Sequence, residues 1–407
     1  MILLLSIFDN IFVVKIRRMK KWKHPHTITG DAVSGVSYLR RPKINDLFWH
    51  FVEKGVDVLF TAPRRVGKTS IMKDIEANAR ENYLCIYKDV EGAMTKEQFY
   101  QRIFEMLVES LSTLKKAKAL FKKWIKKYGI EKIGTDGFKI GRYPSEYRNE
   151  VFSLLGEVAK EDIAIILLID EFVEVILNLK NAGKVEEAIS LLHDMREIRH
   201  NPELKKIIFV YAGSIGLHAV VKEIGRPKLI NDIELLPVEK LSDIEAKNLI
   251  RQLTVGATIQ YSEELEDYLI YKIEHLLPYF IQLMVQEVDL LAYKNEQYTI
   301  NREVIDGAFN NVVRNTANFD DWIKRLKDYL GSDFPFVNQI LTHCAHKGKI
   351  NIQEVYDMAN ASGKVDLYKD LLDDLEHDGY LIANDGIYRF ISPFIKSYWL
   401  HKNPVSR

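Results

Sequence analysis

The chain has 407 residues, and its hydrophobic content of 47% is enough for two or three packed domains and too high for a disordered chain. Lysine plus arginine and aspartate plus glutamate number 57 each, which excludes a global electrostatic attraction to nucleic acid or to an anionic membrane. The only cysteines, Cys85 and Cys344, exclude a disulfide framework and a zinc cluster, and they fit a reducing, cytoplasmic location.

The N-terminal stretch, residues 1–29, is interpreted as an extension of doubtful status. Met1–Val14 is mostly apolar, but its basic residues follow the apolar part, which is the wrong order for a secretory signal. The stretch is also too short for a transmembrane span, so no stable membrane insertion is expected. Met19 is the favoured alternative start, and a weak membrane anchor is the other interpretation.

A strand that runs into a phosphate-binding loop is the strongest pattern. After an amphipathic helix over 44–53, the apolar strand Val56–Thr61 leads into Ala-Pro-Arg-Arg-Val-Gly-Lys-Thr-Ser, residues 62–70, and a second amphipathic helix follows. Backbone N–H groups of such a loop surround phosphates, and the helix N-terminus adds a positive dipole. Ala62 stands where the usual pattern has its first glycine. Lys68 is predicted to reach the β- and γ-phosphates, and Thr69 to ligate Mg²⁺.

A second motif lies about 100 residues downstream. The run Ile163–Glu171 is continuously apolar until it ends in two acids, which is typical of a strand buried on both faces. Acids at the carboxyl end of such a strand lie where open α/β sheets bind ligands. Asp170 is predicted to hold Mg²⁺, and Glu171 to orient or deprotonate the attacking water. The alternative is a buried strand that merely happens to end in Asp-Glu.

The other strands and helices of the first half alternate. Strands are predicted at 83–90, 207–212 and 233–235, with a helix over 95–111, and this alternation predicts a parallel sheet covered on both faces. Between Leu114 and Lys132 eight lysines surround Phe121, Trp124 and Tyr128. Basic residues mixed with aromatics can bind nucleic acid. The favoured alternative is a helix whose Phe121, Trp124 and Ile125 face the core while its lysines are solvated.

Three segments in this order carry a family resemblance: residues 62–70, Leu-Leu-Ile-Asp-Glu-Phe at 167–172 and Ala-Gly-Ser-Ile-Gly-Leu at 212–217. They resemble the archaeal-type ATPase family, in the STAND branch of the AAA+-like P-loop NTPases. The resemblance runs from about Gly30 to about Trp399 and implies an α/β P-loop core over 30–240, a helical lid over 241–319 and a winged-helix domain over 320–407.

The sequence of the second half fits both implied domains. Ser242 and Glu245 form a capping box at the start of the lid, and helical periodicity follows it. Helices are expected over 337–345, 351–358 and 367–377, then strands over 380–383 and 387–390 around the turn Asn384-Asp385-Gly386, and a closing helix over 392–400. The third helix is strongly acidic, which argues against its reading DNA and favours packing against the core or a protein partner.

The resemblance also implies further site residues. Tyr38–Arg41 resembles the segment near the adenine, Pro278 stands where the lid proline contacts the base although its Gly-x-Pro glycine is missing, and Ser214 is the candidate γ-phosphate sensor. Arg196 and Arg199 are candidate arginine fingers, within the chain or across a subunit boundary. The predicted nucleotide site comprises Arg41, Ala62, Pro63, Arg64, Arg65, Val66, Gly67, Lys68, Thr69, Ser70 and Pro278.

ATP with Mg²⁺ is the expected ligand because no guanine-reading Asn-Lys-x-Asp segment follows the Asp-Glu strand. Three functions stay open: a slow ATPase that works as a nucleotide-controlled switch, an oligomeric remodeller of DNA or protein, and a scaffold that binds ATP without turnover. The switch is favoured, with a protein partner or self-association; nucleic acid is the less favoured partner.

Overall fold

The computed structural model describes residues 21–404 except 114–121, 123, 125, 133–137, 142–143, 162 and 214–215. In this part of the chain the central sheet has five strands, all parallel, in the order β2-β5-β6-β1-β7. The predicted α/β fold with a parallel sheet core is therefore confirmed. The strands are β1 (Val58–Thr61), β2 (Tyr83–Asp89), β5 (Ala164–Asp170), β6 (Ile207–Tyr211) and β7 (Glu234–Pro237).

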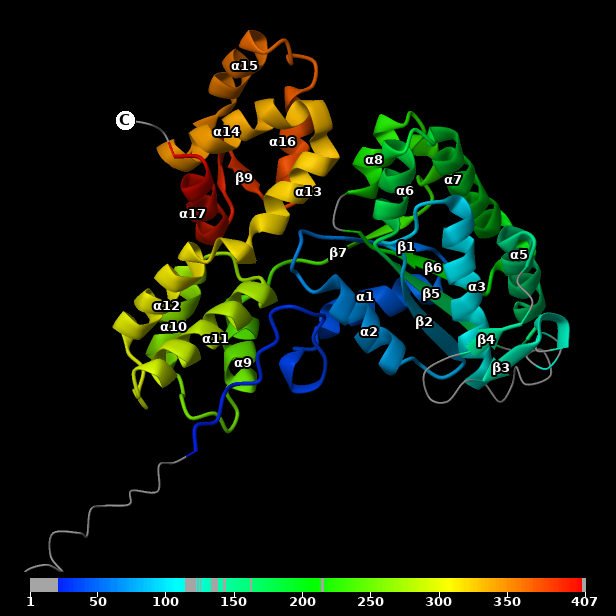
Figure 1. Ribbon diagram of the computed structural model, residues 1–407, viewed down its shortest axis with the longest axis horizontal. Helices are drawn as coiled ribbons and strands as arrows, with labels where there is room; N and C mark the ends of the chain where they lie inside the picture. Colours follow the sequence, from blue (N-terminus) through cyan, green and yellow to red (C-terminus); the bar gives the residue numbers. More distant parts are fainter. Residues whose placement is uncertain are drawn as a thin grey trace, which may run out of the picture.

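Helices cover both faces of this sheet (Figure 1). Residues of β5 alternate between two apolar clusters, with Ile166 and Leu168 in one and Ile165, Leu167 and Ile169 in the other. The first cluster includes α1 (Pro42–Glu53) and α2 (Lys68–Ala77) and continues into the second half of the chain. The second includes α3 (Lys96–Thr113), α5 (Tyr147–Val158), α6 (Phe172–Asn181), α7 (Val185–His200) and α8 (Leu217–Glu223).

The lysine-rich segment lies only partly within the described residues. Trp124 is buried and its Nε1 donates to Glu157 Oε2 at 2.8 Å, as expected for a core-facing aromatic, whereas Phe121 and Ile125 lie outside the described residues. A short antiparallel hairpin, β3 (Ile130–Lys132) and β4 (Phe138–Ile140), follows and was not predicted. Both cysteines are free and buried.

Four helices make up the region predicted as a lid: α9 (Asp243–Leu253), α10 (Glu263–Ile273), α11 (Pro278–Lys294) and α12 (Arg302–Arg314). The capping box at Ser242 is present, with the backbone and side-chain bonds to Glu245 both formed. The N-terminal residues 21–33 run along α11. Trp22 Nε1 donates to Asp289 Oδ1 at 3.0 Å, and His24 Nδ1 lies 2.5 Å from Asp289 Oδ2. Part of the stretch interpreted as an extension thus belongs to the folded body.

The C-terminal part is a separate layer of helices around a small sheet (Figure 1). Its sheet has the antiparallel order β8-β10-β9, and Asp385 and Gly386, both at positive φ, form the two-residue turn between β9 and β10. Its elements are α13 (Asp320–Leu330), α14 (Phe334–Lys347), β8 (Ile350–Asn351), α15 (Ile352–Ala361), α16 (Tyr368–His377), β9 (Leu381–Asn384), β10 (Ile387–Phe390) and α17 (Pro393–Lys402).

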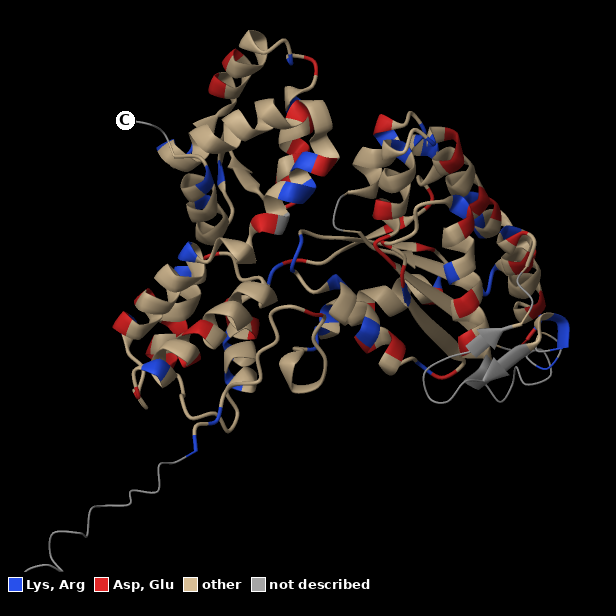
Figure 2. Cartoon of the chain, viewed as in Figure 1, with Lys and Arg blue, Asp and Glu red and all other residues tan. Residues whose placement is uncertain are grey.

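Short 3₁₀ turns connect several elements; they span Gly35–Ser37, Pro202–Leu204, Pro227–Leu229, Thr316–Asn318 and Gly331–Asp333. None of the helices in the described ranges has the length and apolarity needed to cross a membrane. Lysine and arginine are interspersed with aspartate and glutamate over the core, the lid region and the C-terminal part (Figure 2).

Candidate nucleotide-binding site

The loop between β1 and α2 forms the floor of a cavity of about 350 Å³. Arg65 and Gly67 both have left-handed backbone conformations, with φ of 66° and 99°, so the loop curls before α2 begins at Lys68. A non-glycine residue held in this conformation is a strain that is common at ligand-binding sites. The cavity is lined on this side by Arg64, Arg65, Gly67, Lys68, Thr69 and Ser70.

Lys68 is buried at the start of α2. Its Nζ donates to two carbonyl oxygens of its own loop, that of Ala62 at 2.9 Å and that of Pro63 at 3.1 Å. Burial lowers the pKa of Lys68, and the carboxylates of Glu171, Asp170 and Asp378 act in the opposite direction. The buried ammonium group therefore lies near three carboxylates and borders the cavity, where it can form strong bonds to an anionic ligand.

The two motifs that lie far apart in the sequence meet at one hydrogen bond. Thr69 Oγ1 donates to Asp170 Oδ2 at 2.6 Å, and Tyr87 donates its hydroxyl to the same oxygen at 3.1 Å. Tyr87 reaches this oxygen because β2 is paired with β5. Burial raises the pKa of Asp170, while the hydrogen bond from Thr69 lowers it. Tyr87 was not predicted, since a tyrosine in an apolar strand carries no signal of its role until strand pairing is known.

Glu171 lines the same cavity from the first position before α6. Its φ of 55° is left-handed, and its backbone N–H donates to Asp170 Oδ1 at 3.1 Å. The strained turn directs the chain away from the sheet directly after Asp170, which leaves both acids at the carboxyl edge of β5.

The remaining wall of the cavity comes from the lid region and the N-terminal segment. Pro278, Tyr279 and Gln282 of α11 line it, together with residues 28–33. The backbone N–H of Ile28 donates to Gln282 Oε1 at 2.8 Å, and that of Val33 donates to Ser70 Oγ at 3.0 Å. The guanidinium of Arg65 lies 4.4 Å from the centre of the Tyr279 ring. The loop, the lid region and the N-terminal segment thus enclose one site.

Some predicted residues lie elsewhere. Arg41 does not line this cavity; its Nη1 donates to the carbonyl of Glu239 at 2.6 Å and its Nη2 to that of Lys240 at 3.3 Å. The N-terminal segment that lines the cavity is 28–33 rather than Tyr38–Arg41. The path of the chain between these segments depends on distant contacts, which the local sequence does not reveal. Val66 is buried, and Ala62 and Pro63 line a second cavity behind the loop.

The candidate arginine fingers lie at the opposite edge of the sheet. Arg199 Nε contacts Asp232 Oδ2 at 2.8 Å and Asp57 Oδ2 at 3.6 Å, and Asp57 directly precedes β1. Arg196 Nη1 lies 3.1 Å from Asp232 Oδ1. Within one chain, neither arginine is therefore brought to the phosphate loop, which follows the carboxyl end of β1; a role across a subunit boundary stays a prediction. Ser214 lies outside the described residues.

Comparisons with known proteins bear on the fold. No family model and no curated protein matches the chain. The Walker-type ATPase of Pyrococcus abyssi has a TM-score of 0.61 at 15% identity, over 90% of this chain and 99% of that one. ORC2 of Aeropyrum pernix, solved as ADPNP–ADP complexes, has a TM-score of 0.49 at 14% identity, over 93% and 96%. A RuvB variant of Thermotoga maritima has 0.43 at 14%, over 90% and 94%. The chain is thus similar in fold to a Walker-type P-loop ATPase.

Proposed function

We propose that the chain binds ATP with Mg²⁺, hydrolyses it slowly and works as a nucleotide-controlled switch. The observation that carries this proposal is the 2.6 Å bond between Thr69 and Asp170, which joins two motifs 101 residues apart in the sequence. A buried strand that ends in two acids by chance is not expected to place one of them beside the threonine of a phosphate-binding loop. Lys68 and Glu171 line the same cavity.

The residues present fit a magnesium ion. The Thr69 hydroxyl and the Asp170 carboxylate are hard oxygen ligands of the type that Mg²⁺ prefers, and few protein ligands are needed because the ion keeps waters and binds substrate phosphates. Thr69 and Asp170 would hold the ion, which when bound neutralises charge on the β- and γ-phosphate oxygens. Tyr87 would keep the Asp170 carboxylate in place through the bond to Oδ2.

Hydrolysis then follows from the acids and the lysine. Glu171 would orient a water molecule and accept its proton as the oxygen attacks the γ-phosphorus. The bond between that phosphorus and the bridging oxygen breaks, which gives ADP and inorganic phosphate. The Lys68 ammonium would stabilise the negative charge that develops on the phosphate oxygens. The adenine would lie toward residues 28–33 and Pro278, at the other end of the cavity.

The switch assignment and the winged-helix assignment of residues 320–407 belong to the same proposal. The order helix, strand, helix, helix, strand, strand with a β8-β10-β9 sheet supports the winged helix. DNA is not the favoured partner, because α16 is rich in aspartate and one of them, Asp370, contacts Lys222 of α8 at 3.0 Å. A second protein chain is the favoured partner.

Equilibrium binding of a fluorescent ATP analogue, with and without Mg²⁺, tests the site. Lys68→Ala removes the cation at the phosphates and should abolish binding, whereas Lys73→Ala, an exposed lysine on the same helix, should leave binding unchanged. Wild-type protein should bind more tightly with Mg²⁺. Equal binding by Lys68→Ala and wild type would overturn the assignment.

A further inference from the structure

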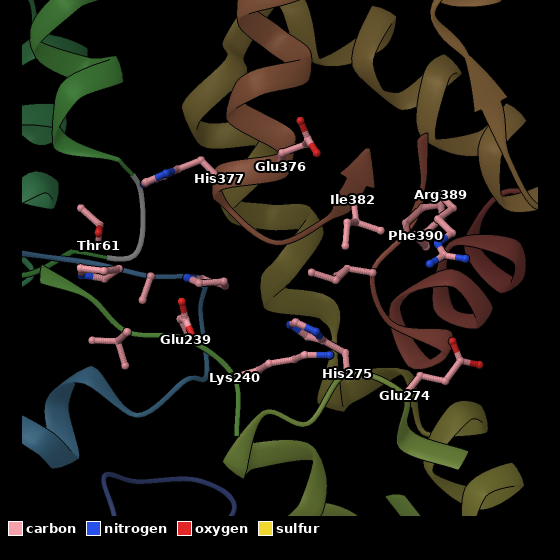
Figure 3. A pocket seen from close by; sticks show the side chains of 15 residues that line it. Thr61, Glu239, Lys240, Glu274, His275, Glu376, His377, Ile382, Arg389 and Phe390 are labelled. Atoms are coloured by element: carbon pink, nitrogen blue, oxygen red, sulfur yellow. The ribbon is translucent and has the colours of Figure 1, made fainter. Parts of the chain in front are cut away.

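The second cavity, behind the phosphate-binding loop, lies where the core, the lid region and the C-terminal part meet. We call it the junction cavity, and its volume is about 590 Å³. Figure 3 shows Thr61 and Glu239 on the core side, His275 from the lid region, and Ile382 and Phe390 from the C-terminal hairpin. Sites for small molecules commonly measure about 300–1,000 Å³, so the junction cavity is large enough to hold one.

His275 is a polar group of this cavity that lacks a partner. It lies in the turn between α10 and α11 and is only 7% exposed. Its Nε2 is buried and has no hydrogen-bond partner within the described part of the chain. A buried nitrogen of this kind is rare, because it has lost its bond to water without gaining another. Figure 3 shows the ring pointing into the cavity, where a ligand would supply the missing partner.

The His275 ring is suited to donate a hydrogen bond without carrying a charge. Burial, and next the positive charge of Lys240, lower the pKa of His275 to about 4. The ring is therefore neutral near neutral pH, and a neutral imidazole can hold its proton on Nε2 and donate it to an acceptor.

Two positively charged side chains border the junction cavity. Lys240 and Arg389 are exposed, and neither side chain forms an ion pair or a hydrogen bond with any residue that the structure describes. Figure 3 shows Lys240 extending toward His275. Two cations without partners beside a hydrogen-bond donor favour a negatively charged group of a ligand.

Three acids also border the cavity, and each is engaged or turned aside. Glu376 Oε1 accepts a hydrogen bond from the backbone N–H of Ala383 at 2.6 Å. Glu239, on the core side, lies in the electrostatic field of Arg41. Figure 3 shows the side chain of Glu274 pointing away from that of His275. The region around Lys240, Arg389 and His275 is thus the part of the wall that suits an anion.

The rest of the wall offers apolar contacts. Val238 on the core side and Phe390 on the hairpin are buried, and Ile382 on β9 is 40% exposed although it is a large apolar side chain. An aromatic ring and branched aliphatic side chains suit a flat, apolar body.

We propose that the junction cavity binds a small organic acid with a flat apolar body, whose acidic group lies against Lys240 and Arg389 and accepts a hydrogen bond from His275 Nε2. None of these three residues lines the nucleotide cavity, so the site is separate from the proposed ATP site and does not depend on it. A molecule bound here contacts all three parts of the chain and stabilises the arrangement in which they meet.

Fluorescence titration with anilinonaphthalene sulfonate tests the site in the full chain at neutral pH. This probe joins a flat aromatic body to an anionic group, and its fluorescence reports binding to apolar surface. N-phenylnaphthylamine has the same rings without the sulfonate and is the matched neutral probe. We expect one saturable site per chain for the sulfonate, and binding of the neutral amine that is weaker by about tenfold or more.

A pair of matched variants locates the bound probe. Ile382→Trp fills the cavity from β9, and we expect it to weaken binding of the sulfonate by about tenfold or more. Ile387→Trp is the control, because Ile387 in the neighbouring strand β10 is also 40% exposed but does not line the cavity. Its binding should equal that of the wild type.

Two further variants test the polar contacts. His275→Phe keeps a ring of similar size and removes Nε2, and Lys240→Ala removes a cation; each should weaken binding of the sulfonate by about tenfold. Lys205→Ala changes an exposed lysine just before β6, at the opposite edge of the sheet, and should bind normally.

Equal binding by Ile382→Trp and Ile387→Trp, equal affinity of the wild type for the two probes, or unchanged binding in both His275→Phe and Lys240→Ala overturns the proposal. Lys240→Ala changes an exposed position and carries the test if Ile382→Trp does not fold. The fluorescent ATP analogue is titrated in parallel. Wild type that binds the sulfonate as expected but not the analogue overturns the proposed function alone.

Discussion

Asp170 is the residue at which the candidate site is held together. Its Oδ2 accepts hydrogen bonds from both Thr69 and Tyr87, so Tyr87→Phe removes one of two bonds that fix the carboxylate. A hydrogen bond to a charged group contributes about 1.5 kcal/mol, so we expect the Mg²⁺ concentration for half-maximal ATP turnover to rise about tenfold. Tyr83→Phe is the control, because Tyr83 lies in the same strand, β2, and its ring packs on Trp49. Equal Mg²⁺ dependence of the two variants would contradict the positioning role.

Arg199 tests whether an arginine near the sheet acts in catalysis or in stability. Its side chain is 4% exposed and contacts two acids, of which Asp57 is itself buried. Arg199→Ala removes the cation from the buried Asp57, while Asp232 keeps its contact with Arg196, and we expect the free energy of unfolding to fall by about 3 kcal/mol. The Arg196 side chain is more exposed, so Arg196→Ala should lower the free energy of unfolding by less. Chemical denaturation measures both; a loss of kcat in folded Arg199→Ala with unchanged stability would instead favour a finger across a subunit boundary.

At the scale of elements, α11 binds the N-terminal segment over the candidate nucleotide site. Gln282 is buried, accepts from the N–H of Ile28 and donates to the carbonyl of Ser37 at 3.2 Å. Gln282→Leu leaves both backbone groups without that partner, which costs about 1–3 kcal/mol and should raise the Kd for ATP about tenfold or more. Gln286→Leu, one turn further along, loses only long contacts to Thr27 and Thr29 and should bind nearly normally. The opposite ranking would show that the segment does not cover the site.

The sequence predicts the helices and strands better than it predicts the contacts between distant residues. The parallel strands and the capping box at Ser242 follow from periodicity and local chemistry, and both are present. Thr69 and Asp170 were each predicted to serve one Mg²⁺ site, and their side chains meet in the structure. The positions of Tyr87 and of the segment 28–33 at the site depend on strand order and on contacts between distant parts of the chain. Local patterns carry no information about such contacts. Arg41 was predicted near the base from the family resemblance, but its guanidinium binds the carbonyls of Glu239 and Lys240 instead.

At the scale of the whole molecule, docking of the C-terminal part should depend on pH. Asp378, directly after α16, is buried and accepts a hydrogen bond from the backbone N–H of Gly216 in the core. Burial raises its pKa from 3.8 to about 8 in the docked state, so the docked state binds more protons between these values and loses stability as pH rises. Lys68, Arg64 and Asp374 face the same carboxyl.

His377 acts on docking in the opposite direction. Burial lowers its pKa from 6.5, so the docked state gains stability as pH rises towards 6.5 and gains no more above that pH. We therefore expect energy transfer between dyes on Glu186→Cys of α7 and Asn360→Cys of α15, both exposed positions, to fall from about pH 7 to about pH 8 in the otherwise unchanged chain. Asp378→Asn should remove this fall. A wild-type signal that is flat over this range, or an identical fall in the variant, would contradict the assignment.

Steady-state ATP turnover of the full chain, measured together with its mass in solution, tests most directly whether the site hydrolyses ATP as a switch; the proteins compared are wild type, Glu171→Gln and the surface control Glu187→Gln. We expect turnover by a monomer at or below about one per second, the low end for enzymes, and a loss of about a hundredfold or more in Glu171→Gln alone. Normal turnover in Glu171→Gln would contradict the site. Fast turnover by an oligomer that ATP assembles would contradict the switch and favour a remodeller.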